Sequence, residues 1–145
     1  MPNTTHHTIH NCVQSLFDTL IDISKGYAVL VERADPAVEG FIQDLADTHT
    51  RDIAEIEIAA KKQGVELDRS GTMMGEVHKA AVKVRDHISD IDSNALEAVA
   101  DGEENVVKRY NSAIAETSEA DELHNVLVIQ RQELRGKIAN IFEAV

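Results

Sequence analysis

The stretch LADTHTRDIAEIE, residues 45–57, decides the fold because it combines helical spacing with polar side chains on the apolar face. Leu45, Ile53 and Ile56 fall on one side of a helix. At about 100° per residue, His49 and Asp52 lie within about 40° of the centre of that side. A helix that turns an imidazole and a carboxylate inward holds either part of a metal site or a buried polar pair.

Composition sets the class of protein around this stretch. A chain of 145 residues corresponds to one domain, and only two prolines and seven glycines interrupt its helix-forming residues. The net charge of −12 and the absence of Trp argue against nucleic acid and anionic membranes as partners. The single Cys12 excludes an internal disulfide, and no leader or long apolar run is visible, so we expect a cytoplasmic protein.

Apolar residues at steps of three and four predict four long helices in one domain, residues 11–145. Residues 1–10, which include HHTIH, are expected to form a flexible N-terminal head. Asp35 and Pro36 suit a helix start, and Gly64 suits a helix end. The expected helices cover 11–34, 36–63, 94–116 and 119–143, with a shorter crossover helix at 72–89.

The connections between these helices predict the topology. Short turns join the first helix to the second and the third to the fourth, which gives two antiparallel hairpins. Residues 64–93 form a much longer connection with a helix of its own, which can return the chain along the bundle. The second and third long helices then run parallel. We therefore predict an all-α, ferritin-like four-helix bundle with a helical crossover.

Polar side chains on the inward faces predict a buried layer. Glu103 lies at the centre of the apolar face of its helix, about 15 Å from the helix start, and His49 lies about 20 Å from the start of its own. Both depths are near the middle of the bundle. On the first helix, Tyr27 and Ser24 point inward, whereas Asp18, Asp22 and Glu32 are expected to point away. The predicted network consists of His49, Asp52, Glu103, Gln130, Arg131 and Tyr27.

A di-iron bundle needs a Glu from each of two helices and a Glu-x-x-His motif from each of the other two. This chain has too few inward carboxylates, and Arg131 places a permanent cation roughly opposite Glu103. We therefore interpret the layer as a network that compensates its own charges, with no cofactor expected. The alternative is a reduced iron or zinc site formed by His49, Asp52 and Glu103.

Several segments resemble an uncharacterised family of small bacterial ferritin-like four-helix-bundle proteins. The similarity covers about residues 13–116 and includes TLIDISKGY, ADPAV, IEIAAKKQGVE, SGTMMGEVHKA and DGEENVVKRYNSAI. Its most specific parts are Ser70, Gly71, Gly75 and His78 in the crossover, and Gly102, Glu103, Glu104 and Tyr110 in the third long helix. The resemblance implies a ferritin-like bundle and a bacterial source, and it implies no activity.

No phosphate-binding loop, nucleophile elbow or CxxC motif is present. We expect a non-catalytic binding or structural module that forms a homo-oligomer or docks a helical protein partner. Cys12 lies at the expected start of the first helix, where a thiol can be acidified, so a redox sensor is a further hypothesis. The structural alternative is that Cys12 is a small packing residue without a reactive thiol.

Overall fold

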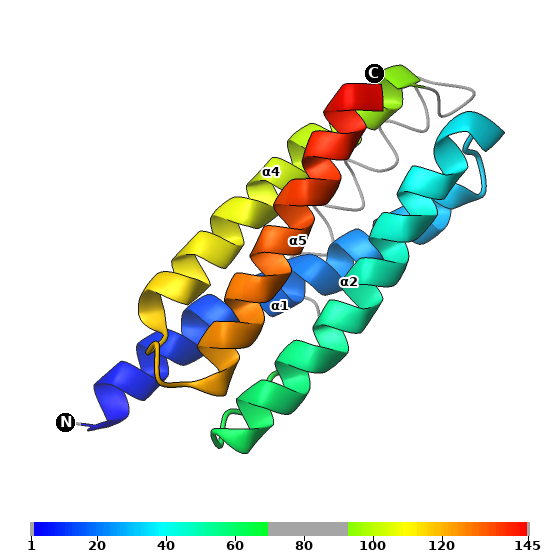
Figure 1. Ribbon diagram of the computed structural model, residues 1–145. Coiled ribbons are helices and arrows are strands. Elements are labelled where there is room, and N and C mark those ends of the chain that lie inside the picture. Colours follow the sequence, from blue (N-terminus) through cyan, green and yellow to red (C-terminus); the bar gives the residue numbers. More distant parts are fainter. Residues whose placement is uncertain (1, 70–92, 145) are drawn as a thin grey trace.

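The computed structural model describes residues 2–69 and 93–144, and the regular elements in these ranges are four α-helices (Figure 1). Their bounds are α1 Pro2–Val31, α2 Pro36–Lys62, α4 Ser93–Glu116 and α5 Glu122–Ala144. The four long helices predicted from apolar periodicity are therefore confirmed. The predicted crossover helix at 72–89 lies outside the described residues.

The ends of α2 follow from local sequence. Asp35 is extended at φ −60° and ψ 146°, and its backbone oxygen, not its side chain, accepts bonds from the amides of Val38 and Glu39. At the other end, Gly64 has φ +80°, and its amide donates to the Lys61 oxygen while the Val65 amide donates to the Ala60 oxygen. This paired pattern is a Schellman motif, and it confirms Gly64 as the helix stop.

The four helices pack as two antiparallel hairpins. α1 packs against α2 and α4, and α5 packs against the same two helices from the other side. Figure 1 shows that α2 and α4 run in the same direction, while α1 and α5 run in the opposite one. The end of α2 and the beginning of α4 consequently lie at opposite ends of the bundle.

The core contains the apolar stripes expected from the sequence. Leu16, Phe17 and Leu20 of α1 are fully buried, as are Ile42 and Ile56 of α2. Leu96, Leu123 and Leu127 complete the same cluster from α4 and α5. Each such side chain contributes roughly 1.5–3 kcal/mol by leaving water, so this cluster holds the hairpins together.

Two features of α1 differ from expectation. The helix begins at Pro2, whereas we expected its start at residue 11. Asp18 and Asp22, expected to point away from the core, are only 6% and 2% exposed. A helical wheel identifies only the most apolar face of a helix. Asp18 and Asp22 lie outside that face of α1, and they are buried nonetheless.

Candidate functional site

Glu103 is the centre of a buried polar cluster formed by three helices. Its Oε1 accepts a hydrogen bond from the Tyr27 hydroxyl at 2.8 Å, and its Oε2 lies 2.7 Å from His49 Nε2. Glu103 and His49 are fully buried, and Tyr27 is 7% exposed. The cluster therefore joins α1, α2 and α4 through one carboxylate. We call Tyr27, His49 and Glu103 the buried triad.

Tyr27 acts as a hydrogen-bond donor in this triad. Burial raises the pKa of its phenol well above the usual range, and the charge and hydrogen bond of Glu103 raise it further. The phenol consequently stays protonated, and its hydroxyl donates a hydrogen bond to the carboxylate. Its ring also stacks on His49, with ring centroids 6.0 Å apart and an interplanar angle of 16°. The stack fixes the imidazole plane while Nε2 faces Glu103.

The two nitrogens of His49 have different surroundings. An ionised carboxylate only accepts hydrogen bonds, so we assign the proton of the contact with Glu103 to Nε2. Nδ1 is buried and has no hydrogen-bond partner among the described residues. Since the two nitrogens are on different edges of the ring, Nδ1 does not face the Glu103 carboxylate.

Asp52 lies one turn after His49 and belongs to a second set of contacts. It is 1% exposed, and its Oδ1 accepts bonds from Arg51 Nη2 at 3.0 Å and Nε at 3.3 Å. Arg51 also pairs with Glu133 at 2.5 Å, which links α2 to α5. Burial raises the pKa of Asp52, and the Arg51 guanidinium only partly opposes this effect.

Gln130 joins α5 to α2 and α4 near Asp52. Its Nε2 donates to the Asp52 backbone oxygen at 3.3 Å and to Glu55 Oε1 at 3.1 Å. Its Oε1 accepts from the Tyr110 hydroxyl at 2.9 Å. Gln130 is 2% exposed and Tyr110 is fully buried, so this amide has its donors and its acceptor satisfied inside the bundle.

Arg131 lies in a different place from the one expected. Its Nη1 donates to Asn111 Oδ1 at 2.8 Å in an exposed contact between α5 and α4. The described contacts of Glu103 come from Tyr27 and His49 instead. The buried carboxylate of Asp52 is paired instead with Arg51, whose side chain is half exposed on α2.

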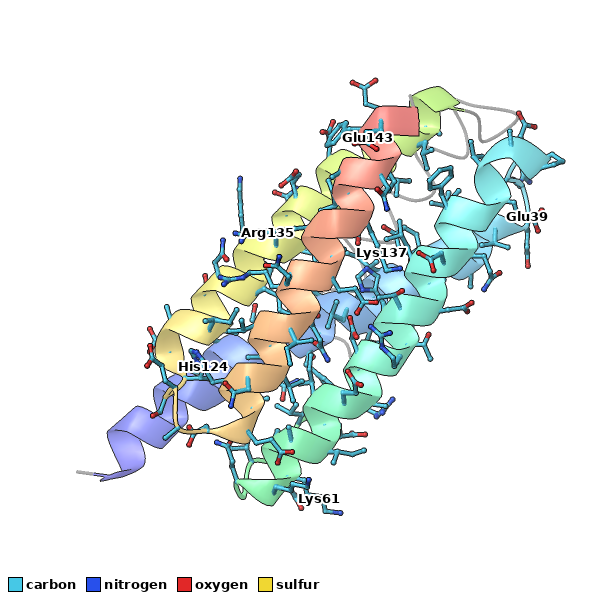
Figure 2. All side chains as sticks on the ribbon, viewed as in Figure 1. Glu39, Lys61, His124, Arg135, Lys137 and Glu143 are labelled. Carbon is cyan, nitrogen blue, oxygen red and sulfur yellow. The ribbon has the colours of Figure 1, made fainter. Side chains whose placement is uncertain are left out.

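Sequence reasoning missed Arg51 and Tyr110. Arg51 points outward on the wheel, but its long side chain reaches back to the neighbouring Asp52. Tyr110 lies three residues after the buried Val107, at the spacing of an apolar face, and its hydroxyl is the only part of the residue that could have indicated a polar contact. His124, at the margin of its stripe, lies near the start of α5, where Nδ1 is 2.8 Å from Thr117 Oγ1 (Figure 2).

The ligand set needed for a metal does not converge in the described part of the chain. There, no group of three or more His, Cys, Asp or Glu side chains could hold a metal ion. Both oxygens of Glu103 are engaged within the triad, and Asp52 is engaged by Arg51. A metal on the remaining Nδ1 of His49 would therefore lie away from the Glu103 carboxylate.

An all-helical bundle with a buried polar layer is the class that this geometry defines. A family model matches residues 8–116 and is described as a domain of unknown function, DUF2383. Because the match covers most of the chain, the protein belongs to this family. The buried triad lies inside the matched region, whereas Gln130 and the rest of α5 lie beyond it.

The other comparisons add no relative. No curated protein matches the chain, and no solved structure does. Among the described helices, none combines the length and the apolar character needed to cross a bilayer.

Proposed function

We propose that this chain is a cytoplasmic, ferritin-like bundle that works as a non-catalytic binding module. The observation that carries the proposal is the state of Glu103, whose two carboxylate oxygens are both occupied by side chains of the same bundle. Because each oxygen of this buried carboxylate has a hydrogen-bond partner, the carboxylate needs no ligand to compensate for its burial. The triad then has a structural task, which is to fix three helices relative to one another.

The helix directions support the ferritin-like assignment. Parallel α2 and α4 need a connection that returns along the bundle, because α2 ends at the end opposite to the start of α4. A four-helix bundle with one long crossover is the ferritin-like arrangement. The likeness concerns topology, and fold alone carries no chemistry.

Access also supports a structural role for the polar layer. A substrate would have to reach Glu103 or His49, and both side chains have no exposed surface. Binding by such a bundle takes place on its outer helix faces. A helical protein partner or a second copy of the chain is the occupant that suits this kind of surface.

The alternative function is metal binding at a reduced iron or zinc site made of His49, Asp52 and Glu103. The one observation in its favour is that the buried Nδ1 of His49 has no described partner. Against it, Glu103 faces the other nitrogen of the ring and Asp52 is paired with Arg51.

Elemental analysis of untagged protein separates the two functions. We expect no stoichiometric iron, manganese or zinc, and no rise in melting temperature when Fe(II) or Zn(II) is added. Glu103→Gln should lower the melting temperature equally with and without metal. Stoichiometric metal that disappears in Glu103→Gln, while Glu104→Gln retains it, would replace the binding-module proposal with the metal site.

A further inference from the structure

Two helices of the bundle carry exposed apolar side chains on their outer side. In α5, residues 126–129 are Val, Leu, Val and Ile, which is more than one core-facing stripe requires. Leu127 is fully buried, whereas Ile129 is 67% exposed. On α2, Ile56 is fully buried and Ile58 is 59% exposed. Among the described residues the only other large exposed apolar side chain is Phe142.

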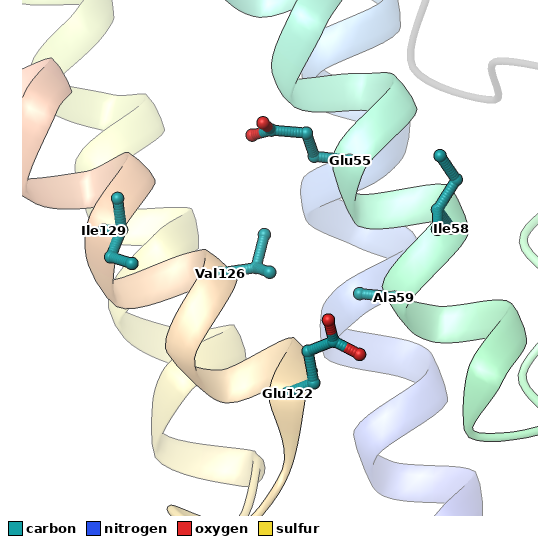
Figure 3. Close-up of a pocket in the computed structure, with 6 residues that line it drawn as sticks. All are labelled: Glu55, Ile58, Ala59, Glu122, Val126 and Ile129. Atoms are coloured by element: carbon teal, nitrogen blue, oxygen red, sulfur yellow. The ribbon is translucent and has the colours of Figure 1, made fainter.

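Ile58 and Ile129 line the same groove, which runs between α2 and α5. Its volume is about 300 Å³, and Figure 3 shows side chains from both helices along it. The lining residues are Glu55, Ile58, Ala59, Glu122, Val126 and Ile129. Val126 and Ala59 extend toward each other between the two helices (Figure 3). Ile58 also borders a second hollow, whose lining is mixed, with Val65 and Leu67 beside the charged Glu57, Lys61 and Glu66.

Ion pairs between α2 and α5 lie on either side of the groove. Arg51 pairs with Glu133 at one end, and Lys62 lies 3.4 Å from Glu122 at the other. Beyond the first pair, Lys137 reaches from α5 to Asp44 of α2 at 2.6 Å (Figure 2). The residues that line the groove on α5 extend from Glu122 to Ile129, which is about 10 Å at 1.5 Å per residue. This length accommodates two turns of a helix, with apolar anchors at i, i+4 and i+7.

The charges of the groove select the kind of partner. Glu55 accepts a hydrogen bond only from the neutral amide of Gln130 among the described residues. Glu122 shares the groove wall, with an exposed Lys62 as its counter-ion. A second copy of the chain would bring the same two carboxylates and a net charge of −12 against them. A partner with basic side chains beside its apolar stripe complements both features.

We infer that the α2–α5 groove binds an amphipathic basic helix of another protein. The apolar anchors of that helix pack against Ile58, Val126 and Ile129, and its Lys or Arg side chains lie against Glu55 and Glu122. This inference rests on the proposed function, since it names the partner of the binding module.

The test uses a panel of synthetic helical peptides with apolar anchors at i, i+4 and i+7 and flanking lysines. Binding to the full chain is measured by fluorescence anisotropy at low and at physiological salt. We expect binding that falls at least tenfold when the lysines become glutamates or the anchors become serines. Ile129→Ser and Ile58→Ser should each weaken it by a similar factor, and Glu55→Gln should weaken only the lysine peptides.

Phe142→Ser is the matched control, because Phe142 is exposed and does not line the groove. Melting temperatures of all variants verify that each folds. The inference is overturned if no peptide of the panel binds, if Ile129→Ser binds as the unmodified chain does, or if sedimentation shows self-association that Ile129→Ser abolishes. These outcomes leave the metal analysis unchanged, so failure of the groove and failure of the proposed function are distinguishable.

Discussion

His49 Nε2 of α2 lies 2.7 Å from Glu103 Oε2 of α4, and both side chains are fully buried. The contact couples two helices that are separated by the whole connection between the hairpins. Removing either partner leaves the other buried with fewer hydrogen bonds, and this cost exceeds the net value of the intact pair.

We expect Glu103→Ala to lower the free energy of unfolding by about 3–5 kcal/mol, because it strips two buried donors of their acceptor and opens a cavity. Urea denaturation followed by circular dichroism measures the change. Glu104→Ala, on the exposed side of the same turn, should change stability by less than about 0.5 kcal/mol. Equal effects at the two positions would contradict a triad centred on Glu103.

The two buried tyrosines allow a comparison between a charged and a neutral acceptor. Tyr27→Phe leaves a carboxylate oxygen of Glu103 unpaired, whereas Tyr110→Phe leaves an amide oxygen of Gln130 unpaired. Hydrogen bonds to charged groups are worth more, so we expect a loss of about 2–3 kcal/mol for Tyr27→Phe and about 1 kcal/mol for Tyr110→Phe. Urea denaturation at neutral pH gives both values, and the reverse order would contradict the assignment.

Asp22 predicts a pH dependence. Its carboxylate oxygens have no hydrogen-bond partner among the described residues, and burial raises its pKa above 3.8 despite the opposing charge of Lys25. The folded state then binds more protons than the unfolded state, so stability falls as pH rises from about 4 through the folded pKa. Asp22→Asn should remove this fall and stabilise the protein at neutral pH by about 1 kcal/mol.

The measurement is the difference in unfolding free energy between Asp22→Asn and the unmodified chain across pH 3 to 8. Asp101→Asn, on an exposed position of α4, serves as the control. A difference that does not grow with pH would show that the Asp22 carboxylate has no unusual cost of ionisation.

Cys12 is expected to react slowly. It lies in the third turn of α1, because the helix begins at Pro2, so it does not occupy the helix end assumed for an acidified thiol. Burial raises the pKa of the thiol, and the charge of Glu116 raises it further. Alkylation at neutral pH should therefore be slower than for free cysteine, and Glu116→Gln should speed it slightly. A rate above that of free cysteine would restore the redox-sensor hypothesis.

Two glycines should respond to alanine with opposite signs. Gly64 has φ +80°, which an L side chain adopts at a cost, so Gly64→Ala should destabilise the protein by about 1 kcal/mol. Gly102 lies inside α4, and a Cβ there meets no atom of another described segment within 4 Å, so Gly102→Ala should stabilise by about 0.5–1 kcal/mol. Thermal unfolding measures both, and a shared sign would contradict the helix-stop assignment of Gly64.

The helices and the similar depths of His49 and Glu103 could be predicted because periodicity gives direction and residue number gives depth. The pairing of these two side chains was not predicted, because the sequence favoured Arg131 as the partner opposite Glu103. The side chains of His49 and Glu103 have fewer rotatable bonds than an arginine, so their positions follow more closely from the backbone. The side chain of Arg131 is long, so its position depended on a neighbour, Asn111, that the wheel could not identify. The burial of Asp22 was missed because a helical wheel marks one apolar face and gives no information on what covers the others.

The triad also has a consequence for the order of folding. Tyr27 and His49 belong to the first hairpin and Glu103 to the second, and the bonded partners are separated by 76 and 54 positions in the sequence. Closing such long loops costs more chain entropy than closing either hairpin. Each hairpin can therefore form on local contacts, while the carboxylate finds its two donors only when the hairpins dock. The triad therefore forms only when the two hairpins pack against each other.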